Sequence, residues 1–283
     1  MLDGRPFVDL TQFIDAAPLA ELDRELAFGL AQMRASCISL TGGSHRSMGI
    51  MPPALQATAL GDYGEILAAM SDADFALFVS LATPAARVDD RARDRNAWGE
   101  DRPLSLSDAQ FRFLEYRGVY FPWRVYVELM PGGMWTEKSL DAGKSFTREA
   151  LTHFPRTVAW IGTLPFASIG SVKLLGLAPL HHGTVHRDGD PALAAPTRTS
   201  ERSGAEGGTR PDEFVTFCPR GDKRLYIWDE RTGAKHYAPS RIYWFDDHEY
   251  HGVEADPFFR YSLRVDGTFL PQFREVLREQ KPM

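Results

Sequence analysis

The sequence predicts an α+β fold, with a mainly helical first half followed by a strand-rich second half. Apolar residues recur at helical spacing up to about residue 118. Beyond about residue 167, short β-branched and aromatic runs are separated by Gly, Pro and Asp. The 283 residues, 43% of them hydrophobic and 25% charged, are enough for a substantial core. We expect one domain over residues 1–283, divided into a helical part (1–118) and a strand-rich part (119–283).

The first expected helix covers residues 18–33 and has Pro18 near its first turn. Its leucines recur three or four positions apart, at Leu19, Leu22, Leu26 and Leu30. The fourth expected helix starts with Ser107 and Gln110, a Ser/Gln pair at capping-box spacing. That fourth helix is expected over residues 105–118, and the other three over residues 63–70, 71–82 and 145–154.

Short strands are expected in the second half, and many short strands with turn signals indicate a sandwich or a barrel rather than a βαβ fold. They fall within residues 119–133, 167–180, 183–188, 214–219, 224–239, 240–245, 250–255 and 258–269. Residues 229–234 have the composition of a hairpin turn. Two polar stretches, residues 82–105 and 192–213, are expected to be loops, and the second is either a lid or a simple insertion.

The composition argues against several classes of protein. The net charge is −6, and aspartates interrupt the one arginine cluster at residues 91–95, so no nucleic-acid partner is expected. The two cysteines, Cys37 and Cys218, are far apart and form no CxxC, which argues against a cysteine zinc site or a disulfide framework. Acidic residues stand where a signal peptide would be apolar, and no apolar run could span a bilayer, so we expect a cytoplasmic protein without a membrane partner.

A dense polar cluster, "HHGTVHRDGD", follows an apolar strand-like run at residues 181–190. His186 and Asp188 are two positions apart, so in a strand both side chains point to the same face and can reach one metal ion. Non-haem Fe(II) oxygenases use two histidines and one carboxylate, which leaves a third ligand to be found. Taken alone, the HxD triplet is better explained as a polar turn after a strand.

Two histidines downstream, His248 and His251, are candidates for the third ligand, and His248 is better placed in a turn. Further on, Arg260, Ser262 and Arg264 alternate with apolar residues in "RYSLRV". The plain interpretation is a sheet with one wet face. The functional interpretation is a strand that lines a barrel mouth, where a guanidinium and a hydroxyl bind a carboxylate.

Together these residues resemble the Fe(II)/2-oxoglutarate-dependent dioxygenases. The resemblance consists of HxD, the distal His251 and Arg260 nine positions further on, and Arg260-x-Ser262 is similar to a cosubstrate signature in part of that superfamily. "HGVEADPFFRYSLRVD" and the approach to His186 also resemble the aspartyl/asparaginyl β-hydroxylase-like branch. The resemblance covers roughly residues 150–270. Some members of that branch lack the carboxylate ligand, whereas this chain has Asp188 in its place.

The resemblance implies a double-stranded β-helix (a jelly-roll or cupin-like barrel) flanked by the helical layer. His186, Asp188 and His251 would hold Fe(II), and these three would be the catalytic centre. The far carboxylate of 2-oxoglutarate would meet Arg260 and Ser262, with Arg264 as the second candidate cation. The implied reaction consumes O₂ and hydroxylates an unactivated C–H bond of a small amino-acid-like or natural-product molecule, with formation of succinate and CO₂.

Two other interpretations stay open. One is a cupin-type metal enzyme that does not use 2-oxoglutarate, in which Arg260 is structural. The other is a non-catalytic β-barrel binding protein, which predicts no metal dependence. The substrate, the choice between hydroxylation and desaturation, cyclisation or epoxidation, and the oligomeric state are not encoded in any motif that we recognise.

Overall fold

The structure is a computed structural model of the whole chain, and it describes residues 6–33, 63–84, 90–94, 106–118, 123–131, 144–188 and 213–279. The expected loop at 192–213 lies outside these residues, except for Glu213. So does Cys37.

Two antiparallel sheets form the body of the protein. A six-stranded sheet has the order β1-β8-β5-β10-β3-β2, and a four-stranded sheet has the order β4-β9-β6-β7. The six-stranded sheet contains β1 (Phe7–Asp9), β2 (Trp123–Met130), β3 (Phe166–Leu177), β5 (Phe214–Phe217), β8 (Ile242–Phe245) and β10 (Arg260–Phe269). The four-stranded sheet contains β4 (Gly183–His186), β6 (Leu225–Trp228), β7 (Lys235–Tyr237) and β9 (His251–Val253). From β3 to β10 the chain therefore passes repeatedly from one sheet to the other.

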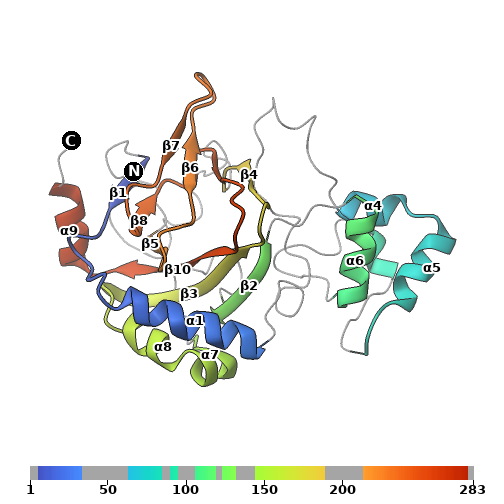
Figure 1. Cartoon of the computed structure of the whole chain (residues 1–283), viewed down its shortest axis with the longest axis horizontal. Helices are drawn as coiled ribbons and strands as arrows, with labels where there is room; N and C mark the ends of the chain where they lie inside the picture. Colours follow the sequence, from blue (N-terminus) through green and yellow to red (C-terminus); the bar gives the residue numbers. More distant parts are fainter. Residues whose placement is uncertain are drawn as a thin grey trace, which may run out of the picture.

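Helices cover the outer face of the six-stranded sheet, and the four-stranded sheet lies on its other side (Figure 1). The covering helices are α1 (Leu19–Met33), α7 (Arg148–His153) and α8 (Pro155–Ile161). Two contacts show which side chains of the strands point toward the helices. Tyr261 of β10 donates to Asp23 of α1 at 2.5 Å, and Trp160 of α8 meets the Phe217 ring of β5 edge-on. Because side chains alternate along a strand, the neighbours of Tyr261 point toward the four-stranded sheet.

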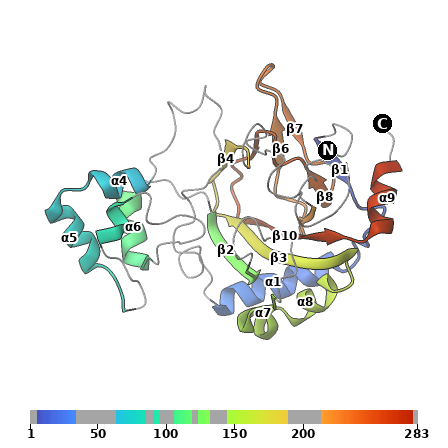
Figure 2. The same cartoon turned by 180° about the vertical axis from the view of Figure 1, so that it is seen from behind.

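Further helices lie at the edges of this body. α4 (Tyr63–Ala69), α5 (Asp72–Ser80), the 3₁₀ helix η2 (Asp90–Arg93) and α6 (Asp108–Tyr116) share a separate hydrophobic cluster, to one side of the sheets in both views (Figures 1 and 2). Ser107 and Gln110 form a complete capping box at the start of α6. The last helix, α9 (Pro271–Glu279), follows β10, and Arg274 binds Glu213 through both side-chain oxygens.

The structure contains the expected mixture of helices and antiparallel strands, although the boundaries of the elements shift by a few residues. The five expected helices are present as α1, α4, α5, α6 and α7. Four elements of the described residues were not expected: β1, η2, α8 and α9. Expecting only loop at 82–105 was incomplete, because η2 lies within it. Within the described ranges, no helix has both the length and the apolarity needed to cross a membrane.

The interpretation of "RYSLRV" as one face of a half-wet sheet is wrong. β10 is the central strand between β3 and β5, and most of its residues are buried on both faces. The apolar stripe packs toward the helices, and the polar stripe of Arg260, Ser262, Arg264 and Asp266 is enclosed between the sheets.

Candidate metal centre

Three potential metal ligands meet where β4 and β9 lie side by side. His186 ends β4 and is the direct antiparallel partner of His251, the first residue of β9. The two imidazole rings have centroids 4.5 Å apart, and Nε2 of His186 lies 3.5 Å from Oδ1 of Asp188. One ligand atom from each of His186, Asp188 and His251 lies within 4.8 Å of the others. The structure therefore brings together the three residues that the sequence singled out.

The backbone holds this cluster in register. The amide of Asp188 donates to the Asp247 carbonyl at 2.7 Å, which fixes the segment after β4 to the turn before β9. On the other side of β9, His251 pairs with Ile227 of β6. His251 thus lies on the middle one of three adjacent strands and is paired on both sides, so strand pairing and not a loop determines its place.

His251 has the protonation state that a metal ligand requires. Its Nδ1 lies 2.9 Å from the carbonyl oxygen of Glu249, and because a carbonyl only accepts, Nδ1 carries the proton. Nε2 is then left with its lone pair for a metal. Burial, and to a lesser degree the neighbouring His186, lowers the pKa of His251 to about 4, so the ring is neutral at physiological pH. Neutral imidazole is the form that binds metal ions.

A largely buried cation, Arg264, lies beside Asp188. Arg264 of β10 contacts Asp247 at 2.8 Å, Asp266 at 2.8 Å and Asp188 at 3.9 Å, and its guanidinium lies over the Phe214 ring. Burial alone would lower the pKa of Arg264, but the three aspartates outweigh it and raise the pKa. Arg264 therefore keeps its charge and orients the acidic groups around the cluster.

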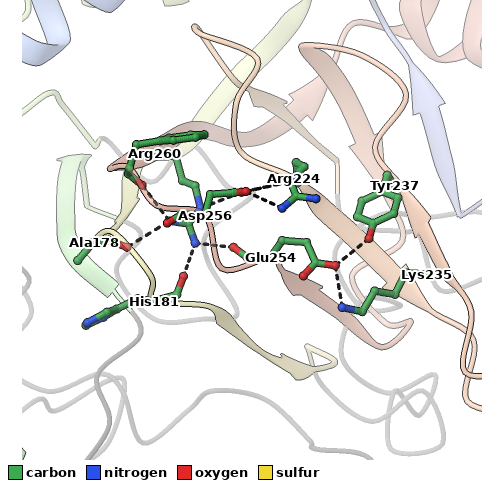
Figure 3. A network of polar contacts seen from close by, with 9 residues as sticks. Ala178, His181, Arg224, Lys235, Tyr237, Glu254, Asp256 and Arg260 are labelled. Carbon is green, nitrogen blue, oxygen red and sulfur yellow. Dashed lines mark hydrogen bonds and ion pairs between the residues drawn. The ribbon is translucent and has the colours of Figure 1, made fainter.

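Arg260 is the first residue of the same strand, four positions before Arg264, and its side chain is fully buried. Its guanidinium donates to the carbonyl oxygens of Ala178, His181, Glu254 and Phe258, and Nε lies 3.5 Å from Asp256 (Figure 3). These acceptors belong to the β3–β4 and β9–β10 connections. Arg260 therefore ties the two connections together at this end of the sheets.

The same network extends to the surface of the four-stranded sheet. Asp256 also binds Arg224 through both of its oxygens, and the Glu254 side chain accepts from Lys235 and Tyr237 of β7, each at 2.7 Å (Figure 3). The carboxylate partner of Arg260 is thus already shared with a second arginine.

Between Arg264 and Arg260 on β10, Ser262 meets a buried lysine that sequence reasoning did not consider. Nζ of Lys223, a residue 5% exposed in the β5–β6 connection, donates to Oγ of Ser262 at 2.6 Å and to the Leu175 carbonyl at 3.4 Å. Burial lowers the pKa of Lys223 to about 8. No local signal marks this lysine, because "PRGDKR" has the composition of an exposed turn.

The remaining histidines of the described chain lie outside the cluster. His182 is exposed, His236 lies on edge strand β7, and His153 ends α7 beside Gln32. A second close group, Asp246, Asp247 and His248, is occupied internally: Asp247 binds Arg264, and Asp246 accepts from the His248 amide. As expected, His248 belongs to the turn before β9.

The chain was compared with family models, curated proteins and solved structures, and matches are found among solved structures. No protein-family model matches the sequence, and no curated protein matches it. Among solved structures, a 2OG-Fe(II) oxygenase family oxidoreductase from Burkholderia pseudomallei matches with 10% identity and a TM-score of 0.29, over 57% of this chain and 78% of that one. A Trichoplax adhaerens prolyl hydroxylase in complex with a hypoxia inducible factor peptide matches with 11% identity and a TM-score of 0.28, over 58% and 71%. The viral collagen prolyl hydroxylase of Paramecium Bursaria Chlorella virus-1 matches with 9% identity and a TM-score of 0.25, over 51% and 78%.

Proposed function

We propose that this protein is an Fe(II)- and 2-oxoglutarate-dependent oxygenase built on a double-stranded β-helix. The observation that carries the proposal is the meeting of His186, Asp188 and His251 across two paired strands. Two imidazoles and one carboxylate on one side of a metal are the donor set of non-haem Fe(II) oxygenases. The repeated passage of the chain between two facing sheets supports the jelly-roll architecture.

The donor set fits Fe(II) in its chemistry. Both imidazoles lie within reach of one carboxylate, and the hydrogen bond at Nδ1 of His251 orients Nε2 toward the cluster. When bound, Fe(II) together with 2-oxoglutarate and O₂ supplies an oxidant for an unactivated C–H bond, with succinate and CO₂ as co-products. The protein's own part is to hold the ligands, neutralise nearby charge and orient the organic reactants.

We assign the far carboxylate of 2-oxoglutarate to Lys223 and Ser262. These two side chains present an ammonium and a hydroxyl together between the sheets. Ser262 is two positions along β10 from Arg264, and Arg264 contacts the proposed ligand Asp188. The Lys223–Ser262 pair is therefore displaced by roughly 7 Å along the strand from Arg264. A five-carbon diacid is long enough to span such a separation. A carboxylate there would also stabilise the charged form of the buried lysine.

This assignment departs from the expectation that Arg260 is the main carboxylate partner. Backbone carbonyl oxygens already accept hydrogen bonds from Nη1 and Nη2 of Arg260, and Asp256 supplies its counter-charge. In the proposal Arg260 holds the β3–β4 and β9–β10 connections together, and Arg264 positions Asp188 and Asp247. The substrate is a small amino-acid-like or natural-product molecule.

The cupin-type alternative would keep the metal and dispense with the cosubstrate. The buried Lys223–Ser262 pair favours the oxygenase, because a metal enzyme without an anionic cosubstrate has no use for an ammonium between its sheets. A non-catalytic binding protein would have no use for the triad.

Succinate formation tests the proposal. Purified protein supplied with Fe(II), 2-oxoglutarate and O₂ is expected to release succinate slowly even without substrate, and Asp188→Asn, which keeps the shape of the side chain and removes its charge, is expected to abolish this. His153→Ala is the matched control, because His153 lies on α7 beside Gln32. Equal succinate release by the wild type and Asp188→Asn would overturn the proposal.

A further inference from the structure

A cavity lies beside the strand segments that carry the three candidate metal ligands. It has a volume of about 610 Å³, within the usual range of small-molecule sites. Arg187, which lines it, stands between the ligands His186 and Asp188 in the chain, and Tyr250 directly precedes the ligand His251. Ile227, also in the lining, is the cross-strand partner of His251. Whatever fills this cavity therefore contacts the segments that carry all three ligands.

One wall of the cavity is aromatic. Trp228 and Tyr250 meet edge-to-face with centroids 6.2 Å apart, and the Trp228 amide donates to the Tyr250 carbonyl at 2.7 Å. The guanidinium of Arg187 lies 5.2 Å from the centre of the Tyr250 ring. The wall thus already holds a cation against an aromatic face, which is the arrangement that aromatic rings favour.

Acidic side chains outnumber basic ones in the lining. The charged residues are four carboxylates and two guanidinium groups: Asp229, Glu230, Asp246, Glu249, Arg187 and Arg231. Burial alone would raise the pKa of Asp246, but hydrogen bonds from His248 outweigh it and lower the pKa, so Asp246 is ionised at neutral pH. Glu230 and Glu249 are exposed and need no rearrangement to meet a ligand. The cavity therefore favours positive charge.

We propose that this cavity anchors a cationic part of the substrate, an ammonium or guanidinium group on an apolar stem. The stem would lie against Trp228 and Tyr250, and the cation would face Glu249 and Asp246. This inference rests on the oxygenase function proposed above and narrows its substrate class to organic cations. Binding energy at such a remote group orients the rest of the substrate toward the metal centre.

The charge preference of the cavity can be tested by the binding of matched small molecules, with no need for enzymatic turnover. Butylguanidinium, butylurea and butanoate share an apolar stem and differ in charge, and their binding to the purified protein without added metal or 2-oxoglutarate is measured by calorimetry. We expect butylguanidinium to bind about tenfold more tightly than butylurea, and butanoate to bind most weakly. Higher salt should weaken only the cation.

Two variants locate the binding. Glu249→Gln is expected to weaken butylguanidinium binding about fivefold and to leave butylurea unchanged, because only the charge is removed. Glu149→Gln on α7, an exposed glutamate in a first helical turn, is the matched control and should bind like the wild type. Circular dichroism confirms that each variant is folded, and Glu230→Gln at another point of the lining serves if Glu249→Gln is not.

Equal binding of the three probes, no binding of the cation, or tighter binding of butanoate would each overturn the inference. Since no metal is present, these outcomes leave the oxygenase proposal intact. Conversely, failure to bind Fe(II) together with normal butylguanidinium binding would contradict the oxygenase proposal, and the cavity would remain a cation site without that substrate.

Discussion

His186 and His251 face each other across strands β4 and β9, with their ring centroids 4.5 Å apart and the ring planes inclined by 53°. In the sequence they are 65 positions apart (251 − 186), so only the pairing of the two strands makes them neighbours. Two imidazoles at this separation, with Asp188 beside them, can reach one metal ion.

Removal of one ligand should therefore abolish tight metal binding. His251→Ala is expected to weaken Fe(II) binding by more than about 100-fold, since the loss of a supporting residue alone costs 10–100-fold. The affinity is measured by anaerobic titration. His153→Ala is expected to match the wild type, and unchanged affinity in His251→Ala would exclude His251 as a ligand.

Lys223→Met should remove the proposed carboxylate partner while keeping the length of the side chain. We expect the Kd for 2-oxoglutarate to rise about 30-fold, because truncating one partner of a buried charge pair costs at least about 2 kcal/mol. Fe(II) binding should be unchanged. Lys235→Met removes a partly exposed lysine on β7 and should affect neither ligand. A Lys223→Met protein with wild-type 2-oxoglutarate affinity would contradict the assignment.

The buried lysine should also affect the pH dependence of stability. Burial lowers the pKa of Lys223 from its ordinary 10.5 to about 8 in the folded protein. Between these two values the unfolded chain binds more protons, so the contribution of Lys223 to the free energy of unfolding rises with pH, by at most about 3 kcal/mol. Urea unfolding on both sides of this window should show that rise in the wild type relative to Lys223→Met. A constant difference between the two proteins would place the lysine in contact with solvent.

Arg260 should matter more for stability than for the cosubstrate. Arg260→Met leaves several backbone carbonyls at the β3–β4 and β9–β10 connections without a donor, and it leaves Asp256 with only Arg224. Loss of one partner of a buried charged pair costs about 3–5 kcal/mol, which chemical denaturation would measure. The Kd for 2-oxoglutarate should change less than the Kd of Lys223→Met changes. The reverse order would return the cosubstrate to Arg260.

Much of the architecture could be predicted because its signals are local. Leucine spacing marks α1, and Ser107 with Gln110 marks the start of α6. β1 was missed because its length, Phe7–Asp9, is too short for a visible alternation. α8 begins at Pro155, directly after α7, so the break in the pattern concealed a second helix.

In the candidate site, too, some residues could be identified from the sequence and others could not. His186 and Asp188 share a recognisable triplet, and His251 precedes a patterned strand, so these residues could be selected from sequence. Lys223 could not, because its burial comes from contact with Ser262, 39 positions further along the chain. The role of Arg260 depends on carbonyl oxygens, which no side-chain pattern encodes.

The most direct test of the central claim is anaerobic titration of the apoprotein with Fe(II) and then 2-oxoglutarate, followed in the visible spectrum. Chelation of Fe(II) by the 2-oxo acid produces a metal-to-ligand charge-transfer band. We expect the band in the wild type, its absence in His251→Ala, and a higher 2-oxoglutarate concentration for half-saturation in Lys223→Met. Iron binding without a band in the wild type would contradict the 2-oxoglutarate assignment and favour the cupin-type enzyme, and no iron binding would contradict the metal centre itself.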